Sequence, residues 1–410
     1  MNSDLDLYQL DDLLTPADLA LRDRIRGWVQ TRFAPEINRC WNAGTFPLEL
    51  VPEIASLGVF GGGIQGYGCA GWSPLTYGLA LQELERGDTG LRTFASVQGA
   101  LAMNAIHMFG SEAQKNQWLP AMARGEKLGC FGLTEPNHGS NPGGMETRAI
   151  KTADGYELTG SKMWIGGGIL ADVAVVWAKV ENEPNVDPNS SEAVRGFLVP
   201  RGSEGFQASV IDGKYSLRIG ITCRLEFNRC RLATDSLLPG TNGLKAPLQC
   251  LNHARYGIAW GVLGAAQACF EEARTYALRR RQFGKPLASF QLTQRKLALM
   301  ASEITSAQLM AFRLAQLKAE GKATFVQISM AKRNNVAMAL NVARTAREIL
   351  GGVGILDEHV SFRHMCNLES VQTYEGGVLS LWCCRSCAWP SPRWPGPRNF
   401  PPSAPPPTRR

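Results

Sequence analysis

Residues 130–140 read CFGLTEPNHGS and residues 160–165 read GSKMWI. These two segments are the most informative part of the sequence for the fold. The first has a strand-like start, a turn stiffened by Pro136 and a Gly-Ser end, so it can direct backbone N–H groups and hydroxyls toward a polar ligand. The second places Trp164 between short strands. Taken singly, the first segment also fits a structural turn, and Trp164 also fits a core residue.

Around these segments the chain has the pattern of a β domain. Residues 155–233 hold short runs rich in β-branched and aromatic residues, separated by turn-forming residues. The runs that we expect to be strands are Tyr156–Leu158, Val173–Ala178, Gly196–Val199 and Arg224–Phe227. We therefore predict a middle antiparallel β domain over residues 129–243.

Both flanks of this domain have helical periodicity. Stripes run through Ala17–Phe33 and Pro74–Leu84, and the Ser111 hydroxyl can cap a helix by accepting from an unpaired N–H. In the last third, apolar residues recur at the spacing of one buried bundle-helix face: Leu297, Met300, Ile304, Ala307, Ala311 and Leu314. The prediction is an α+β fold with an N-terminal helical domain (1–128), the β domain and a C-terminal helical bundle (244–376).

Bulk properties exclude several classes of protein. A chain of 410 residues exceeds one ordinary core, and 44% hydrophobic with 19% charged residues is typical of a globular protein. The net charge of +7 is compatible with an anionic ligand, but no dense Lys/Arg block indicates nucleic-acid binding. No apolar run reaches the roughly 20 residues that a spanning helix needs, so we expect no membrane insertion.

The termini and cysteines bear on the compartment. Met1–Tyr8 is acidic and lacks the features of a secretion signal or a transit peptide. Eight of the eleven cysteines are scattered singly between Cys40 and Cys366, which suits a reducing compartment, and we expect a cytoplasmic bacterial protein. Cys384 and Cys387 form a C-x-x-C without a second pair or a His at zinc spacing, so we expect no metal site.

After Gly376 the composition changes abruptly. Nine of the 23 prolines lie between Pro390 and Pro407, and three tryptophans and three cysteines lie between Trp382 and Trp394. Proline removes a backbone donor and stops helices. We expect residues 377–410 to be a disordered tail rather than a continuation of the bundle.

The combination of motifs resembles the acyl-CoA dehydrogenase family. CFGLTEP followed some thirty residues later by G-x-K-x-W-I is typical of that family, and the later segments follow in family order: YALRRRQFG at 276–284, Gln291, LGGVG at 350–354 and YEG at 374–376. Three further segments look like its glutaryl-CoA branch: LRTFASVQ at 91–98, GKYSL at 213–217 and NHARYGIAWGVLG at 252–264.

The resemblance implies FAD as the cofactor. Residues 131–140 would line the flavin, and Trp164 would cover its ring, while Arg280, Gln291 and Gly351–Gly352 would reach the FAD of a neighbouring subunit in a homotetramer. A guanidinium pairs bidentately with phosphate, although Arg279–Arg281 also fits a solvated helix face. The implied cofactor positions are Phe131, Leu133, Thr134, Ser140, Trp164, Ile165, Gly166, Arg280, Phe283, Gln291, Glu348, Gly351, Gly352 and Gly377.

The resemblance also implies a base and a substrate. Glu375 matches the catalytic base, whose pKa desolvation would raise, whereas Arg255 stands where some relatives carry another base and cannot abstract a proton. Arg92 would bind the distal carboxylate of glutaryl-CoA, which would give crotonyl-CoA and carbon dioxide, with electrons passed to an electron-transfer flavoprotein. The implied substrate positions are Glu85, Arg92, Thr93, Ser96, Ser140, Leu248, Asn252, Arg255, Tyr374 and Gly376.

Several positions depart from the family pattern. Gly166 and Gly167 stand where the family has Thr and Asn, and a glycine cannot supply the hydroxyl that would bond the flavin. Asn141 replaces an Asp, Val353 an Asn and Gly377 a Thr. The loss of pattern from Gly377 onward suggests a shifted reading frame and a missing last helix. A dehydrogenase of another short acyl-CoA, with Arg92 only structural, and an inactive flavoprotein-fold protein therefore stay open as alternatives.

Overall fold

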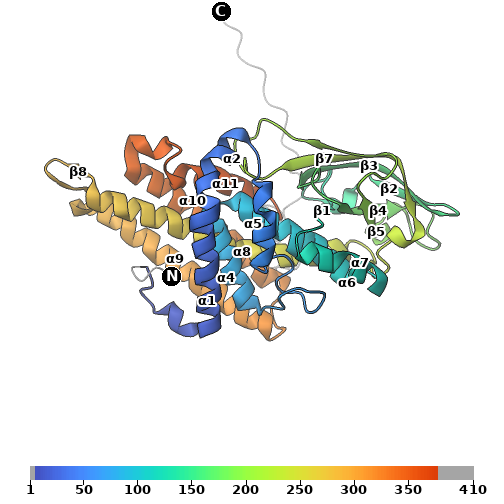
Figure 1. Ribbon diagram of the computed structural model, residues 1–410, viewed down its shortest axis with the longest axis horizontal. Coiled ribbons are helices and arrows are strands. Elements are labelled where there is room, and N and C mark those ends of the chain that lie inside the picture. The colour runs from blue at the N-terminus through green and yellow to red at the C-terminus, as the bar shows by residue number, and fades with distance from the viewer. Residues whose placement is uncertain (1–4, 377–410) are drawn as a thin grey trace, which may run out of the picture.

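Helices and strands follow one another in the predicted α–β–α order (Figure 1). The computed structural model describes residues 5–376, so the predicted tail and Gly377 lie outside the described residues. The N-terminal helices are α1 (Pro16–Trp28), α2 (Ile37–Ala43), α3 (Val51–Ser56), α4 (Pro74–Gly87), α5 (Thr89–Ser96), α6 (Asn104–Phe109) and α7 (Glu112–Ala123). Ser111 caps α7 as predicted, because its hydroxyl accepts from the N–H of Gln114.

The middle segment forms one sheet of β1 (Gly129–Gly132), β2 (Arg148–Lys151), β3 (Gly155–Gly166), β4 (Val173–Val180), β5 (Val194–Pro200), β6 (Phe206–Val210) and β7 (Thr222–Ala233). The strand order is β1-β4-β2-β3-β7-β6, with β5 also paired to β4. The sheet is mixed rather than wholly antiparallel, because β4 runs parallel to both β1 and β2. Residues 133–172 separate β1 from β4 and residues 152–172 separate β2 from β4, which is enough chain for the crossovers that parallel pairs require.

The C-terminal segment is a bundle of α8 (Lys245–Arg279), α9 (Gln291–Ala319), α10 (Phe325–Leu350) and α11 (Val360–Thr373), with a short hairpin of β8 (Arg281–Gln282) and β9 (Lys285–Pro286). The predicted stripe on α9 is confirmed: Met300, Ile304, Ala307, Ala311 and Leu314 are buried, and Leu297 packs beside them. The expected α+β fold is therefore correct.

Helix α8 packs closely against α4 because glycines lie at the contact. A Cβ at Gly264 would lie 1.9 Å from the carbonyl oxygen of Gln82, and one at Gly261 would lie 2.1 Å from Oε2 of Glu85. A side chain at Gly264 would meet the backbone of α4 and push the helices apart, whereas one at Gly261 would displace the carboxylate of Glu85. The close approach lets Glu85 be buried at the helix contact.

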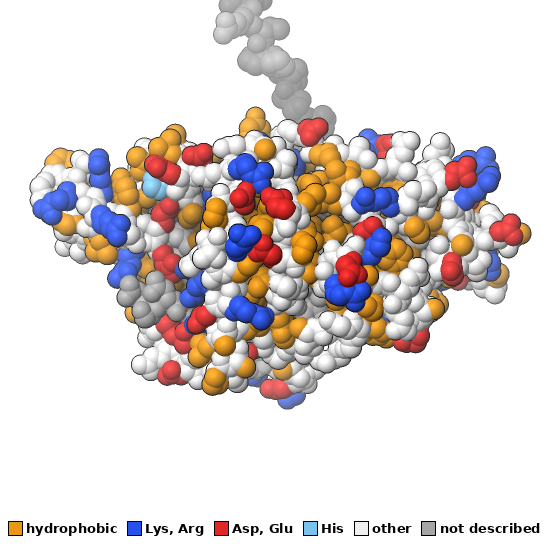
Figure 2. Space-filling view, viewed as in Figure 1, with side chains coloured by type: hydrophobic (Ala, Val, Ile, Leu, Met, Phe, Trp, Pro, Cys, Tyr) orange, Lys and Arg blue, Asp and Glu red, His pale blue; other side chains and the backbone are white. Residues whose placement is uncertain are grey.

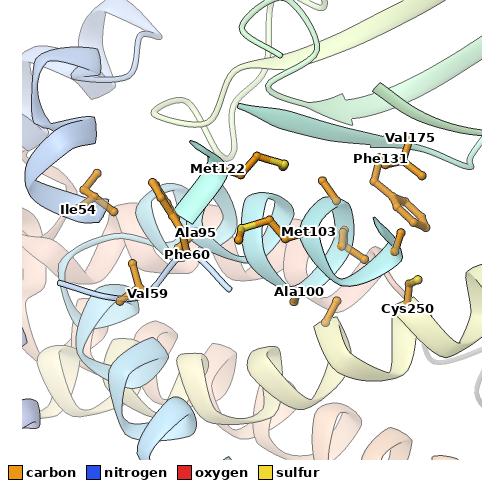
Figure 3. Packing of buried hydrophobic residues seen from close by; sticks show 14 of the residues in the cluster. Ile54, Val59, Phe60, Ala95, Ala100, Met103, Met122, Phe131, Val175 and Cys250 are labelled. Carbon is orange, nitrogen blue, oxygen red and sulfur yellow. The ribbon is translucent and has the colours of Figure 1, made fainter. Parts of the chain in front are cut away.

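The helices and the sheet meet in one apolar core. Phe131 and Val175 of the sheet face Met103, Met122 and other apolar residues of the N-terminal helices (Figure 3). The ring of Phe131 lies 5.8 Å from that of Trp177. The start of the CFGLTEP segment is thus anchored by its side chain in the core, on a strand that pairs with β4.

A buried ion pair joins the segment 130–140 to the segment 160–165. Nζ of Lys162 lies 2.8 Å from Oε1 of Glu135, and both side chains are almost fully buried. Glu135 also accepts from the backbone N–H of Thr147, and the N–H of Met163 donates to the carbonyl of Thr134 at 2.8 Å. Burial lowers the pKa of Lys162 to about 8, although Glu135 opposes this shift.

Breaking this ion pair on one side should strongly destabilise the protein. Lys162→Met leaves the Glu135 carboxylate buried without its cation, which typically costs about 3–5 kcal/mol. Denaturant unfolding should show this loss, and Lys162→Met combined with Glu135→Gln should show a smaller one. Arg124→Met, which breaks the exposed Arg124–Glu126 pair, is the control and should cost far less stability. If Lys162→Met and Arg124→Met lowered the free energy of unfolding equally, the Glu135–Lys162 pair would not have the stabilising role assigned to it.

Candidate active site

The candidate base lies in a tight turn directly after α11. Glu375 has φ +51° and Gly376 has φ +100°, both in the left-handed region. That conformation is strained for a glutamate, and surrounding structure must hold it in place. The turn therefore exposes its carbonyl groups to neighbouring donors.

Two cations supply those donors. Nε of Arg255 donates to the carbonyl of Glu375 at 2.7 Å. Nζ of Lys332 donates to the carbonyls of Tyr374 at 2.9 Å and Gly376 at 3.1 Å. Each of the three carbonyls of the Tyr-Glu-Gly turn thus accepts a hydrogen bond from a positively charged side chain.

A third cation, Arg92, reaches the same turn from α5. It is 1% exposed, and its Nε lies 2.6 Å from Oε2 of Glu85, which is itself fully buried. Its Nη2 donates to the Tyr374 hydroxyl at 2.7 Å. The Thr89 hydroxyl donates to the other oxygen of Glu85 at 3.0 Å. The predicted residues Glu85, Arg92 and Tyr374 therefore form one connected polar cluster inside the protein.

The carboxyl of Glu375 is set up as a base. Burial raises its pKa, while the nearby charges of Arg92, Arg255 and Lys332 act in the opposite direction. Its Oε2 is buried and has no hydrogen-bond partner among residues 5–376. A desolvated carboxylate with a free oxygen is a stronger base than an exposed one.

Other predicted substrate residues surround this cluster. The Thr93 hydroxyl lies 3.4 Å from that of Tyr374, and the Ser96 hydroxyl is buried with no partner among the described residues. Asn252 lies one turn before Arg255 on α8 and accepts from its Nη1 at 3.4 Å. Leu248, also on α8, is half-buried.

The residues predicted to line the flavin lie at or just beyond the ends of β1 and β3. Phe131, Leu133 and Ile165 are buried, so only their backbone can face a ligand, whereas Thr134 is half-buried and Ser140 is exposed. Trp164 is 57% exposed and has φ +66°. A large aromatic side chain held outward in a strained conformation offers a flat apolar surface to a ring.

The two glycines after Ile165 lie at a crevice between the sheet and the N-terminal helices. Gly166 and Gly167 line this crevice together with Thr93 and Val97. A Cβ at Gly166 would lie 3.1 Å from Val97, whereas one at Gly167 would meet nothing within 4 Å. The exposed Trp164, the open space beside Gly167 and the buried Ser96 hydroxyl, which has no partner among the described residues, all fit a planar cofactor with an adjoining acyl ligand.

The remaining predicted cofactor residues lie elsewhere. Arg280, Phe283 and Gln291 are exposed at the β8–β9 hairpin, which projects at the opposite end of the molecule from the sheet (Figure 1). Lys and Arg side chains gather at that end (Figure 2). Gly351 and Gly352 are exposed after α10, and Glu348 pairs with Lys296 at 2.8 Å. The fold does not bring these residues to the Glu375 turn of their own chain.

Sequence reasoning missed two cations, Lys162 and Lys332. Lys162 belongs to the G-x-K-x-W-I motif, but the motif alone does not show that its ammonium is buried against Glu135. Lys332 lies on the apolar face of α10, beside Ile328, Ala331 and Val336. A lone lysine on such a face is the signal that would have revealed it, because burying an ammonium requires partners.

Comparison with known proteins matches most of the chain to one family. Family models described as the N-terminal, middle and C-terminal domains of acyl-CoA dehydrogenase match residues 15–126, 130–230 and 241–377. A crystal structure of a glutaryl-CoA dehydrogenase from Mycobacterium smegmatis in complex with FADH2 is 46% identical, with a TM-score of 0.89, covering 92% of this chain and 95% of that one. The butyryl-CoA dehydrogenase structure from Megasphaera elsdenii is 33% identical, with a TM-score of 0.85 and coverage of 90% and 97%.

A sequence relative points in the same direction. The short-chain specific acyl-CoA dehydrogenase of Megasphaera elsdenii is 34% identical over 353 residues, which is 85% of this chain and 91% of the relative. The chain belongs to the acyl-CoA dehydrogenase family. This membership and the FADH2 complex of the mycobacterial relative support the predicted FAD. Among residues 5–376, none of the helices is both long enough and apolar enough to cross a membrane.

Removing the charge of Glu375 should stabilise the fold at neutral pH. Because the folded state raises the pKa of this carboxyl, ionising it opposes folding, and the penalty is present above the folded-state pKa and disappears below the unfolded one. Glu375→Gln should therefore raise the midpoint of thermal unfolding at pH 8, and the difference should vanish as the pH falls. The exposed Glu303→Gln is the control. A lower midpoint for Glu375→Gln at pH 8 would contradict the environment described.

Proposed function

We propose that this protein oxidises an acyl-CoA thioester, with Glu375 as the base, and that the substrate is glutaryl-CoA. One observation carries the proposal. The buried guanidinium of Arg92 donates to the hydroxyl of Tyr374, and the next residue, Glu375, has a buried carboxyl oxygen with no hydrogen-bond partner among the described residues. The carboxylate suits proton abstraction, and the guanidinium suits an anionic end of the substrate.

The chemistry assigns one task to Glu375. The α-proton of a thioester is a weak acid, so a desolvated carboxylate held close to it is required. Bound FAD would supply the acceptor for the hydride that leaves the β-carbon. Trp164 would exclude water from this region, and donors to the thioester carbonyl would stabilise the developing enolate.

Arg92 can bind a carboxylate without losing its present contacts. A guanidinium carries five N–H groups, and the bonds to Glu85 and Tyr374 use two of them. Glu85 compensates the charge of Arg92 in the absence of substrate, which keeps the site from holding an unpaired buried cation. The Ser96 hydroxyl, buried and without a partner among the described residues, is a further donor for the same carboxylate.

In the proposed reaction, decarboxylation comes after the oxidation. Oxidation of glutaryl-CoA would give glutaconyl-CoA, in which the γ-carbon carries the distal carboxylate. Loss of carbon dioxide breaks the bond between these carbons and leaves a dienolate, which takes back a proton from Glu375 to give crotonyl-CoA. The electrons would pass to an electron-transfer flavoprotein.

The exposed residues at the far end of the bundle support a cofactor site shared between subunits. Arg280, Gln291 and Gly351–Gly352 cannot reach their own catalytic turn, so in a homotetramer they would hold the FAD of a neighbour. The bacterial cytoplasm is the proposed location, and the eight described cysteines, which are all free, suit a reducing compartment.

A second candidate is a dehydrogenase of another short acyl-CoA. The 34% identity to a short-chain specific enzyme favours it, and Arg92 would then serve only to join the helices. Under that alternative, loss of Arg92 would not change the preference between glutaryl-CoA and butyryl-CoA.

Replacing the Glu85–Arg92 pair by neutral residues separates the two candidates. Glu85→Gln with Arg92→Met leaves no uncompensated charge, and a hydrogen bond to a charged group contributes about 1.5–3 kcal/mol. Turnover of glutaryl-CoA should therefore fall roughly 10- to 100-fold relative to butyryl-CoA. Glu83→Gln with Arg26→Met, which removes another buried ion pair of α4, is the matched control and should leave the ratio unchanged. Equal losses for both substrates would favour the second candidate.

An anaerobic titration of the purified protein with glutaryl-CoA tests the reaction itself. The flavin absorbance should bleach, and carbon dioxide should be released once an electron acceptor is added. Bleaching without carbon dioxide would leave an acyl-CoA dehydrogenase of another substrate. A colourless protein that takes up no FAD would support the inactive alternative.

A further inference from the structure

The Glu375 turn is held by a lysine that lies on a different helix. Lys332 is 1% exposed on α10, and its ammonium donates to the carbonyls of Val371 at 2.9 Å, Tyr374 at 2.9 Å and Gly376 at 3.1 Å. An ammonium has three N–H donors and no acceptor. Its three donors therefore match three backbone acceptors.

Those acceptors enclose the residue with the strained backbone. Val371 lies in the last turn of α11, where carbonyls have no partner within the helix and where a cation is favourable. Tyr374 and Gly376 lie on either side of Glu375, whose own carbonyl accepts from Arg255. The left-handed conformation of Glu375 is thus fixed from both sides while its Oε2 keeps no partner among the described residues.

We infer that Lys332 is a positioning residue for the base: its ammonium, together with Arg255, holds the backbone of Glu375 in the conformation from which the carboxylate acts. The inference depends on the proposed function, in which Glu375 removes the α-proton. Lys332 does not touch the substrate. It acts through the turn, so its loss should impair proton abstraction more than ligand binding.

Proton abstraction can be measured without oxidation. In 3-thiabutanoyl-CoA a sulfur replaces the β-carbon, so no hydride can leave, and only exchange of the α-protons with D2O reports on the base. The FAD-loaded protein is incubated with this thioester in D2O, deuterium uptake is followed by mass spectrometry, and the dissociation constant is measured for the same ligand.

Lys332→Met should lower the exchange rate about 100-fold, since a misplacement of about 1 Å can cost that much, while the dissociation constant changes little. Wild-type exchange in the folded, FAD-loaded variant would overturn the inference, as would a parallel loss of binding and exchange. If Lys332→Met does not yield folded protein, the exchange rate and the dissociation constant are measured on Lys332→Gln, which has two N–H donors. The same results would then support or overturn the inference.

Two further variants separate the causes. Lys179 is also buried and donates to a backbone carbonyl, that of Asn189 at 2.8 Å, but it lies in the β domain. Lys179→Met should therefore leave the exchange rate unchanged, and a similar loss there would show that any buried lysine matters equally. Glu375→Gln should abolish exchange. If exchange survives Glu375→Gln, the proposed base is wrong, whatever Lys332 does.

Discussion

The buried guanidinium of Arg92 is the constraint on which the site depends. A charge removed from water needs partners, and Arg92 finds them in Glu85 of α4 and Tyr374 after α11. Joining α4, α5 and the end of α11 in this way links the N-terminal helices to the turn that holds Glu375. The bulk of Glu85 in turn requires Gly261 on α8. The polar cluster and the close helix packing are therefore parts of one arrangement.

In the sheet, the buried Glu135–Lys162 ion pair joins separate segments, as Arg92 does among the helices. It joins the turn after β1 to the middle of β3, and the same β3 carries Trp164 in a left-handed conformation. Trp164 and Glu375 are two of the eight described non-glycine residues with positive φ, and each lies close to a buried ion pair or to cationic hydrogen bonds. Strained backbone persists where the surrounding structure over-determines it, and these contacts supply that support at the two positions.

Sequence reasoning succeeded where local patterns carry the information. The cap at Ser111, the apolar stripe on α9 and the strand runs such as Val173–Ala178 all follow from periodicity or local hydrogen bonding, and all are confirmed. It failed on the direction of β4 against β1 and β2, because alternation along one strand does not reveal its neighbours. The motif resemblance named Glu375 and Arg92 but not what holds them.

The sequence by itself determined the family, the α–β–α order and the identity of the candidate base, because helical spacing and motif order are local properties of the chain. The pairing of Arg92 with Glu85 and the hydrogen bonds from Lys332 to the turn around Glu375 are visible only in the tertiary structure. The same holds for the distance between that turn and the β8–β9 hairpin, beside which Arg280 and Gln291 lie. These relations join residues up to some 280 positions apart, such as Arg92 and Tyr374. They arise from the packing of α4, α5, α8, α10 and α11 around buried charges, and no local pattern encodes such packing.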